Sequence, residues 1–299
     1  MKKPLFTGSG VALVTPMHKD GSINYEAFRK LVEFQISGGT KALIVFGTTG
    51  ESSTLSDMEK LKLLETAVEA ADGRIPVIAG TGSNDTHHAV TLSRSAQRLG
   101  ADGLLIVTPY YNKCSTEGLK RHYFSIADAV DIPVIAYNVP SRTGVSMTLP
   151  VYQALSAHPN MNGVKEASGS TELVLSTVAS CGDEFYVWSG NDSQIVPLMA
   201  LGAMGVISVL ANICPAETEK MAEACLAGEF DSASRLQRRY VPLITALFSD
   251  VNPIPVKTAM NLMGMEAGPL RLPLCEPGSE PAERLKEILR SLNLLTATE

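Results

Sequence analysis

Eight short apolar runs, rich in Val, Ile and Leu, recur along the chain and are separated by longer segments with a helical pattern. They are Gly10–Val14, Ala42–Phe46, Pro76–Ala79, Gly103–Val107, Pro133–Tyr137, Gly163–Lys165, Tyr186–Ser189 and Gly205–Val209. Most of them start roughly 30 residues after the previous one, which is the length that a strand–helix–strand unit needs. Because the runs lack polar alternation, they indicate parallel strands that are buried on both faces.

The segments between the runs carry residues that typically begin and end helices. Residues 56–59, Ser-Asp-Met-Glu, have the spacing of a capping box, and Ser170 precedes another helical pattern. Gly73 and Gly100 stand where two of the patterns end. Eight alternating units predict an α/β fold of the (β/α)8 class, a TIM barrel, because an open doubly wound sheet more often has fewer strands.

The pattern changes after the eighth run. Residues Pro215–Gly228 would form the last barrel helix, and the rest of the chain shows only helical patterns, at Asp231–Phe248, Pro253–Met263 and Glu280–Leu294. The last of these has one continuous apolar face. We therefore expect a barrel domain, residues 1–228, and a C-terminal helical appendage, residues 229–299, that packs on the barrel and also takes part in oligomer contacts.

Composition narrows the class of protein. Of the 299 residues, 45% are hydrophobic and 19% are charged, and the formal net charge is −6. This chain can bury a large core, so disorder, collagen and coiled coil are excluded. The acidic balance and the lack of a long apolar window predict no nucleic-acid partner and no membrane partner. The five scattered cysteines and the absence of a CxxC or HExxH motif predict no metal site and a cytoplasmic location.

Candidate chemistry lies at the carboxyl ends of the strands, where (β/α)8 barrels place their active sites. Lys165 ends the sixth run. If its side chain faces the barrel interior, loss of hydration lowers its pKa and yields the neutral amine that a Schiff base requires. The alternative is a solvated lysine, or one that pairs with a carboxylate such as Glu51.

Three hydroxyl residues stand at neighbouring strand ends. Tyr137 ends the fifth run, Thr48 follows the second, and Tyr111 follows the fourth. A phenol beside Lys165 could pass protons to and from a carbinolamine, and the three hydroxyls could form a short relay. Taken singly, each could equally be a capping or core-edge hydroxyl.

Two features could bind carboxylates. The Gly47-Thr48-Thr49-Gly50 turn offers backbone N–H groups near a helix start, and it lacks the lysine of a phosphate-binding loop. Arg142 follows Pro140 and could bind a second carboxylate with both arms of its guanidinium. The alternatives are an ordinary turn and a surface arginine.

Six motifs together are similar to those of the dihydrodipicolinate synthase family. They are GTTGES at 47–52, VTPYYNK at 107–113, YNVPSRTG at 137–144, GVKEAS at 163–168, GVISV at 205–209 and NPIPVK at 252–257. The resemblance covers essentially the whole chain. It implies a class I aldolase-like barrel that condenses pyruvate with L-aspartate 4-semialdehyde in lysine and diaminopimelate biosynthesis. It also implies that neither a metal nor an organic cofactor is needed.

The resemblance assigns roles by position. Lys165 matches the lysine that forms the Schiff base, Tyr137 the proton-shuttling tyrosine, and Thr48 the threonine that links it to a second tyrosine. Tyr111 matches that second tyrosine, which the family donates across a tight dimer interface, so a homo-oligomer is implied, either a dimer or a tetramer built as a dimer of dimers. Residues that match substrate-binding positions are Thr49 for the pyruvate carboxylate, Arg142 for the semialdehyde carboxylate, and Gly190 and Ile207 through their backbones.

Members of the family that are inhibited by lysine bind it near the dimer interface. The matching positions here are Ser52, Ser53, Asp57, Lys60, Asn84, His88 and Tyr110. Lys60 stands where such members often carry histidine, and His88 where they carry a carboxylate. Both changes oppose binding of a cationic amino acid, each by up to about 4 kcal/mol at an effective dielectric near 20. We therefore predict weak or absent lysine feedback.

Two other functions remain open. Another pyruvate-dependent Schiff-base lyase, such as a sialate lyase or a keto-deoxy-sugar aldolase, would share Lys165 and Tyr137. Arg142 and Thr49 favour the synthase, because a polyhydroxylated aldehyde does not need a carboxylate clamp. A catalytically silent barrel that only binds a keto acid would have no use for the amine at a strand end.

Overall fold

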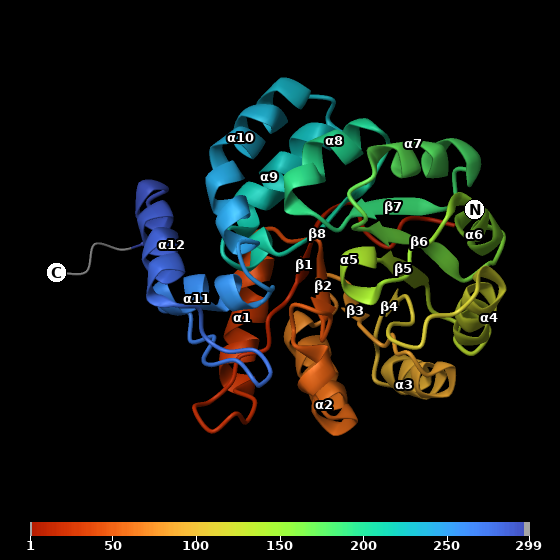
Figure 1. Cartoon of the computed structure of the whole chain (residues 1–299), viewed down its shortest axis with the longest axis horizontal. Helices are drawn as coiled ribbons and strands as arrows, with labels where there is room; N and C mark the ends of the chain where they lie inside the picture. The colour runs from red at the N-terminus through yellow and green to blue at the C-terminus, as the bar shows by residue number, and fades with distance from the viewer. Residues whose placement is uncertain (1, 296–299) are drawn as a thin grey trace.

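The computed structural model describes residues 2–295 and forms a closed barrel of eight parallel strands in chain order (Figure 1). The strands are β1 (Gly8–Ala12), β2 (Ala42–Val45), β3 (Val77–Ala79), β4 (Gly103–Val107), β5 (Val134–Asn138), β6 (Met161–Glu166), β7 (Tyr186–Ser189) and β8 (Gly205–Ser208). Strand β8 pairs with β1 and closes the barrel. The predicted (β/α)8 fold is confirmed.

Helices connect the strands and surround the barrel (Figure 1). They are α1 (Tyr25–Ser37), α2 (Asp57–Ala71), α3 (Thr86–Arg98), α4 (Thr116–Ala127), the short α5 (Pro140–Thr143), α6 (Leu149–Ser156), α7 (Thr171–Ser180), α8 (Ile195–Ala200) and α9 (Pro215–Leu226). The capping box forms as predicted, since the Ser56 side chain accepts from the Glu59 N–H and Glu59 reaches back. The Ser170 hydroxyl likewise accepts from the backbone N–H of Leu173.

The strands follow the apolar runs closely, and two of them begin two residues before their runs. Strand β6 begins at Met161, before its apolar run, because the polar residue Asn162 interrupts the apolar pattern but still belongs to the strand. The Asn162 side-chain oxygen accepts from the Leu5 N–H, and its amide group donates to the Lys3 carbonyl, at the base of the barrel. Strand β1 begins at Gly8, which pairs with Gly205 of β8. A Cβ on Gly205 would lie 1.9 Å from the Gly8 carbonyl oxygen, so the close approach of the two strands requires glycine.

The barrel interior is apolar below the strand ends. A cluster of buried side chains fills it, including Ile44, Ile78, Ile135 and Ile207. Trp188 stacks on Phe6 at 5.2 Å between ring centroids and its indole N–H donates to the Phe6 carbonyl. This filling excludes water from beneath the strand ends, so any charge placed there is poorly hydrated.

Three further helices follow the barrel: α10 (Phe230–Leu247), α11 (Ile254–Leu262) and α12 (Ser279–Ser291). Helix α12 buries Leu285 and Leu289 of its apolar face and packs against α10 and α11. Helix α10 packs on α8 and α9. The division into residues 1–228 and 229–299 remains our proposal; residue 1 and residues 296–299 lie outside the described part.

Two structural features are absent from residues 2–295. No helix there combines the length and apolarity needed to cross a membrane. No group of three or more His, Cys, Asp or Glu side chains in the same range could hold a metal ion.

Candidate active site

Lys165 lies inside the barrel. It is the fifth residue of β6, it aligns with Tyr137 of β5 and Trp188 of β7, and only 5% of its surface is exposed. Its ammonium nitrogen lies 4.4 Å from the centre of the Tyr137 ring, and it makes no hydrogen bond to any residue of the described chain. The interior placement that the strand pattern predicted is therefore the one observed.

Burial lowers the pKa of Lys165 to about 7, because the charged form loses its hydration. The Asp192 carboxylate opposes this shift and the Arg142 guanidinium adds to it. The paired alternative is wrong for Glu51: its Oε1 lies 2.8 Å from Lys257 Nζ, and its Oε2 accepts from the Arg271 backbone N–H at 2.9 Å. Lys165 therefore supplies a neutral amine near neutral pH.

Tyr137 presents a buried phenol beside this amine. Burial raises its pKa, whereas the nearby Arg142 charge and a hydrogen bond with Thr48 lower it. Strand β5 holds Tyr137 in register with Lys165, and Thr48 follows β2 on the same rim. The structure thus brings Lys165, Tyr137 and Thr48 together, as the strand-end pattern predicted.

Tyr111 does not join them within one chain. Its side chain is 93% exposed, and its backbone has a positive φ of 68°. A bulky residue in that conformation is strained. The phenol therefore projects from the molecule on a constrained loop after β4.

Thr49 and Arg142, predicted to bind carboxylates, share one neighbour. The Asn252 side-chain amide donates to the Thr49 hydroxyl at 2.9 Å, and the Arg142 guanidinium donates to the Asn252 carbonyl at 3.1 Å. Asn252 begins the NPIPVK motif but received no role from the sequence, because nothing local to it indicates contact with residues more than a hundred positions away. Asn252 is thus a site residue that sequence reasoning missed.

Gly190 and Ile207 were matched to substrate-binding positions by the resemblance alone; Gly190 directly follows β7, and Ile207 lies within β8. The Gly190 N–H donates to the Glu166 carbonyl at 2.7 Å, and a Cβ there would lie 3.1 Å from Lys165 Cε and 2.7 Å from Ala167 Cβ. Only glycine leaves room for the lysine side chain. Ile207, on β8, belongs to the apolar interior beneath the site.

Asp192 and Glu166 are two buried carboxylates whose roles the sequence did not reveal. Asp192 Oδ2 accepts from the backbone N–H groups of Val209 and Leu210, whereas Oδ1 has no hydrogen-bond partner in the described chain. Glu166 accepts from the Tyr152 hydroxyl and from Asn138 behind β6. Glu166 is the last residue of β6 and Asp192 lies three residues after the end of β7, and this position near a strand end is the signal that could have singled them out.

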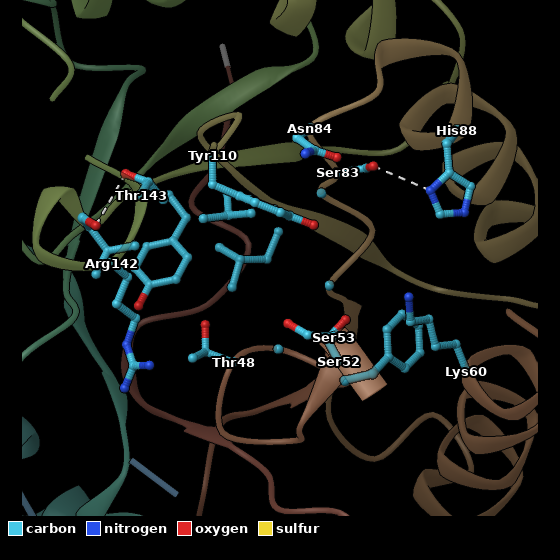
Figure 2. Close-up of a pocket in the computed structure, with 18 residues that line it drawn as sticks. Thr48, Ser52, Ser53, Lys60, Ser83, Asn84, His88, Tyr110, Arg142 and Thr143 are labelled. Carbon is cyan, nitrogen blue, oxygen red and sulfur yellow. Dashed lines mark hydrogen bonds between the residues drawn. The ribbon is translucent and has the colours of Figure 1, made fainter. Parts of the chain in front are cut away.

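A cavity of about 480 Å³ opens beside these groups (Figure 2). Thr48, Tyr137 and Arg142 line one end, and Lys60 and His88 line the other. Four more of the predicted effector positions also line it, namely Ser52, Ser53, Asn84 and Tyr110, whereas Asp57 does not. Thr48, Tyr137 and Arg142 therefore share one continuous cavity with most of the predicted effector positions, whereas Lys165 and Tyr111 are not among its lining residues.

Lys60 and His88 share one counter-ion. Asp57 Oδ2 lies 2.8 Å from His88 Nε2, and Asp57 Oδ1 lies 3.8 Å from Lys60 Nζ. The other ring nitrogen of His88 bonds the Ser83 hydroxyl at 3.2 Å (Figure 2). Burial lowers the pKa of Lys60. The Asp57 carboxylate is thus engaged by two side chains, and no Asp or Glu is among the described residues that line the cavity.

The arrangement suits covalent chemistry on a carbonyl compound. A neutral buried amine is a nucleophile toward a keto group, a neighbouring phenol can move protons, and backbone and guanidinium donors can hold carboxylates.

Comparison with known proteins gives a consistent result. A sequence profile described as the Dihydrodipicolinate synthetase family matches residues 5–292. The 4-hydroxy-tetrahydrodipicolinate synthase of Thermoanaerobacter sp. (strain X514) is 51% identical over 293 residues, which are 98% of both chains. The protein of the same name from Clostridium perfringens (strain SM101 / Type A) is 48% identical over 97% of this chain and 100% of that one.

Solved structures agree with these sequence matches. The dihydrodipicolinate synthase of Aquifex aeolicus superposes with a TM-score of 0.96 at 44% identity, covering 98% of this chain and 100% of that one. A structure from Cyanidioschyzon merolae, described with lysine bound, has a TM-score of 0.95 at 37% identity and the same coverage.

Proposed function

The chain belongs to the dihydrodipicolinate synthetase family, and from that premise we propose that it is a lyase that condenses pyruvate with L-aspartate 4-semialdehyde, a 4-hydroxy-tetrahydrodipicolinate synthase. The observation that carries the proposal is the buried Lys165 amine, with its pKa lowered to about 7, set 4.4 Å from the Tyr137 ring. The product belongs to lysine and diaminopimelate biosynthesis.

The first stage makes an imine. The neutral Lys165 amine adds to the keto carbon of pyruvate, and the oxygen takes up a proton to give a carbinolamine. The Tyr137 phenol supplies the proton that lets the hydroxyl leave as water, and the Thr48 hydroxyl, hydrogen-bonded to that phenol, helps return it. A protonated imine remains on Lys165.

The second stage joins the two substrates. The protonated imine draws electrons from the methyl group, which loses a proton and becomes an enamine carbon. That carbon attacks the aldehyde of the semialdehyde and forms the new carbon–carbon bond. The amine of the bound semialdehyde then attacks the imine carbon and displaces Lys165 as the ring closes. Because the imine itself is the electron sink, the reaction needs no cofactor.

Pyruvate and the semialdehyde each carry a carboxylate that the active site must bind. The turn at residues 47–50 and the Thr49 hydroxyl hold that of pyruvate, and the Arg142 guanidinium holds that of the semialdehyde. Gly190 and Ile207 line the space between them through their backbones. The link through Asn252 supports this assignment, since it ties Thr49 and Arg142 together.

We place Tyr111 in the active site of a second copy of the chain. A phenol that is 93% exposed in a constrained backbone conformation is suited to insert into a neighbour. The proposal requires a homo-oligomer, a dimer or a dimer of dimers. Mixing Tyr111→Phe with Lys165→Met subunits tests it: activity above that of either variant supports donation across the interface, and no gain contradicts it.

Lysine feedback is expected to be weak or absent. A cationic amino acid entering the cavity meets Lys60, no Asp or Glu is among the described residues that line the cavity, and the neighbouring Asp57 already contacts Lys60 and His88. Half-inhibition by sub-millimolar lysine would show the feedback prediction to be wrong, and the Lys60→His, His88→Glu variant is expected to gain sensitivity to lysine.

The free cysteines at positions 114, 181, 214, 225 and 275 suit a reducing compartment, and we propose that the protein is located in the cytoplasm.

The decisive experiment is reductive trapping. The protein is treated with borohydride in the presence of pyruvate, and intact mass and peptide mapping locate the adduct. We expect one three-carbon unit on Lys165 and none on Lys165→Met. A silent barrel would give no adduct. Turnover with sugar aldehydes but not with the semialdehyde would support the other pyruvate lyases instead.

A further inference from the structure

Helix α11 of the C-terminal appendage places the side chain of Lys257 at the rim of the barrel. Lys257 is only 1% exposed, and its ammonium group donates to three acceptors: Glu51 Oε1 at 2.8 Å, the Thr15 carbonyl at 3.1 Å and the Pro269 carbonyl at 2.5 Å. All three of its donors are therefore used. The side chain connects the first strand's loop, the second strand's loop and the segment after α11.

Glu51 ends the turn that carries Thr48 and Thr49, and it has a left-handed backbone with φ 57°. Phe46, at the start of the same turn, has φ 39°. Left-handed backbone costs a non-glycine residue free energy, so surrounding contacts must hold both positions. A Cβ on Gly50 would lie 3.0 Å from Phe46 Cα, which shows how tightly the turn is folded.

Both oxygens of Glu51 are held from the appendage. Lys257 binds Oε1, and the backbone N–H of Arg271 donates to Oε2 at 2.9 Å. The Arg271 guanidinium in turn binds Glu59 and the Thr54 carbonyl. The conformation of residues 47–51 is thus fixed by contacts that come from more than 200 positions later in the chain.

Stability alone does not explain the buried ion pair between Lys257 and Glu51. Removing two charges from water costs free energy that their attraction often fails to recover, and well-packed apolar residues do as well or better. Neither Glu51 nor Lys257 lines the cavity. The pair instead fixes the geometry of one turn, in which Thr48 hydrogen-bonds Tyr137 and Thr49 accepts from Asn252.

We propose that Lys257 and Glu51 are positioning residues for pyruvate: their ion pair holds the turn at residues 47–51 so that its donors meet the substrate carboxylate. The inference rests on the proposed function, since it presumes that pyruvate is bound there. It gives the appendage a part in catalysis without any contact with substrate.

The test separates positioning from stability. Lys257→Met leaves the Glu51 charge buried and unpaired, whereas Lys257→Met combined with Glu51→Gln removes both charges. We expect the double variant to recover most of the melting temperature lost by the single variant. If the pair positions the turn, both variants need about tenfold more pyruvate for half-maximal borohydride trapping, the loss expected for one weakened charge-assisted hydrogen bond.

Two matched controls accompany these variants. Glu219→Gln alters a buried carboxylate at the opposite end of the barrel, where Oε2 accepts from the Ser9 N–H at 2.6 Å. It should lower stability without changing the half-saturation. Lys30→Met breaks an exposed contact with Glu266, 3.2 Å long, which also joins the barrel to the C-terminal segment. It should change neither quantity.

Each outcome decides something. If the double variant binds pyruvate within twofold of the wild type, the pair is only structural and the inference is wrong. If the wild type forms no adduct at all, the proposed function fails instead. Should the double variant not fold, Glu51→Gln alone decides: it keeps the size of the side chain, and faster amide exchange confined to residues 47–54, with a raised half-saturation, supports positioning. Unchanged exchange and half-saturation overturn it.

Discussion

Replacing Lys165 by Met should abolish imine formation and, at neutral pH, make the fold more stable. The pKa of Lys165 is about 7 in the folded chain, against an ordinary 10.5. A change of one in pKa corresponds to about 1.4 kcal/mol, so lowering the pKa from 10.5 to about 7 is an unfavourable contribution to the free energy of unfolding of at most about 5 kcal/mol. Methionine has a similar shape and carries no charge to dehydrate.

The pH dependence has a definite sign. Between pH 7 and 10.5 the unfolded chain binds a proton at Lys165 that the folded chain lacks, so the free energy of unfolding rises with pH across this window. Well below pH 7 both states are protonated and the cost is fully present, whereas at pH 7 about half of the folded molecules already carry the neutral amine. The stability gained by Lys165→Met should therefore be largest at pH 7 or below and shrink toward pH 10.

The assay is unfolding followed by circular dichroism at several pH values for both proteins. Lys257→Met is the matched control. The same substitution there leaves the buried Glu51 charge without its ion-pair partner and should lower the free energy of unfolding by about 3 to 5 kcal/mol. If Lys165→Met is no more stable than the wild type at pH 7, or if its advantage does not change with pH, the amine is not buried as we describe.

Three further predictions concern other groups. Tyr137→Phe should lower turnover by roughly 10² to 10⁴, the range for loss of a general acid–base group, while pyruvate trapping still occurs slowly. Gly190→Ala should slow trapping at least about tenfold, since its Cβ would lie 3.1 Å from Lys165 Cε and displaces the amine. Burial lowers the pKa of His122 to about 4, so stability should fall as pH drops from 6.5 to 4, by at most about 3 kcal/mol. His122→Asn should flatten that dependence in urea unfolding; an unchanged slope would contradict it.

The barrel could be predicted from sequence because each strand is buried on both faces. Continuous apolar runs at regular intervals then follow directly from the fold. The prediction missed the starts of β1 and β6, and at β6 the reason is Asn162, which is polar yet buried. Its amide is satisfied by Lys3 and Leu5, and a partner so distant leaves no local signal.

The site was predictable in part for a similar reason. Lys165, Tyr137 and Thr48 were found because the barrel geometry places strand ends together, and position along a strand can be read locally. Asn252 and Lys257 were not found, since their importance comes from contacts with Thr49 and Glu51 across more than 200 positions. Barrel topology specifies where strand ends lie but not where an appended helix packs.

Two lysines illustrate what sequence context leaves open. Lys165 follows Gly-Val and Lys257 follows Pro-Val, both are nearly inaccessible, and burial lowers the pKa of each. Lys257 has a carboxylate and two carbonyls within hydrogen-bond distance, so its charge is held in place. Lys165 has the face of Tyr137 and no hydrogen-bond acceptor within the described chain, while the nearby Asp192 directs its Oδ2 to the backbone of residues 209 and 210. An amine left without an acceptor loses its proton more readily and keeps its lone pair free, so reactivity arises at the lysine that the fold does not pair.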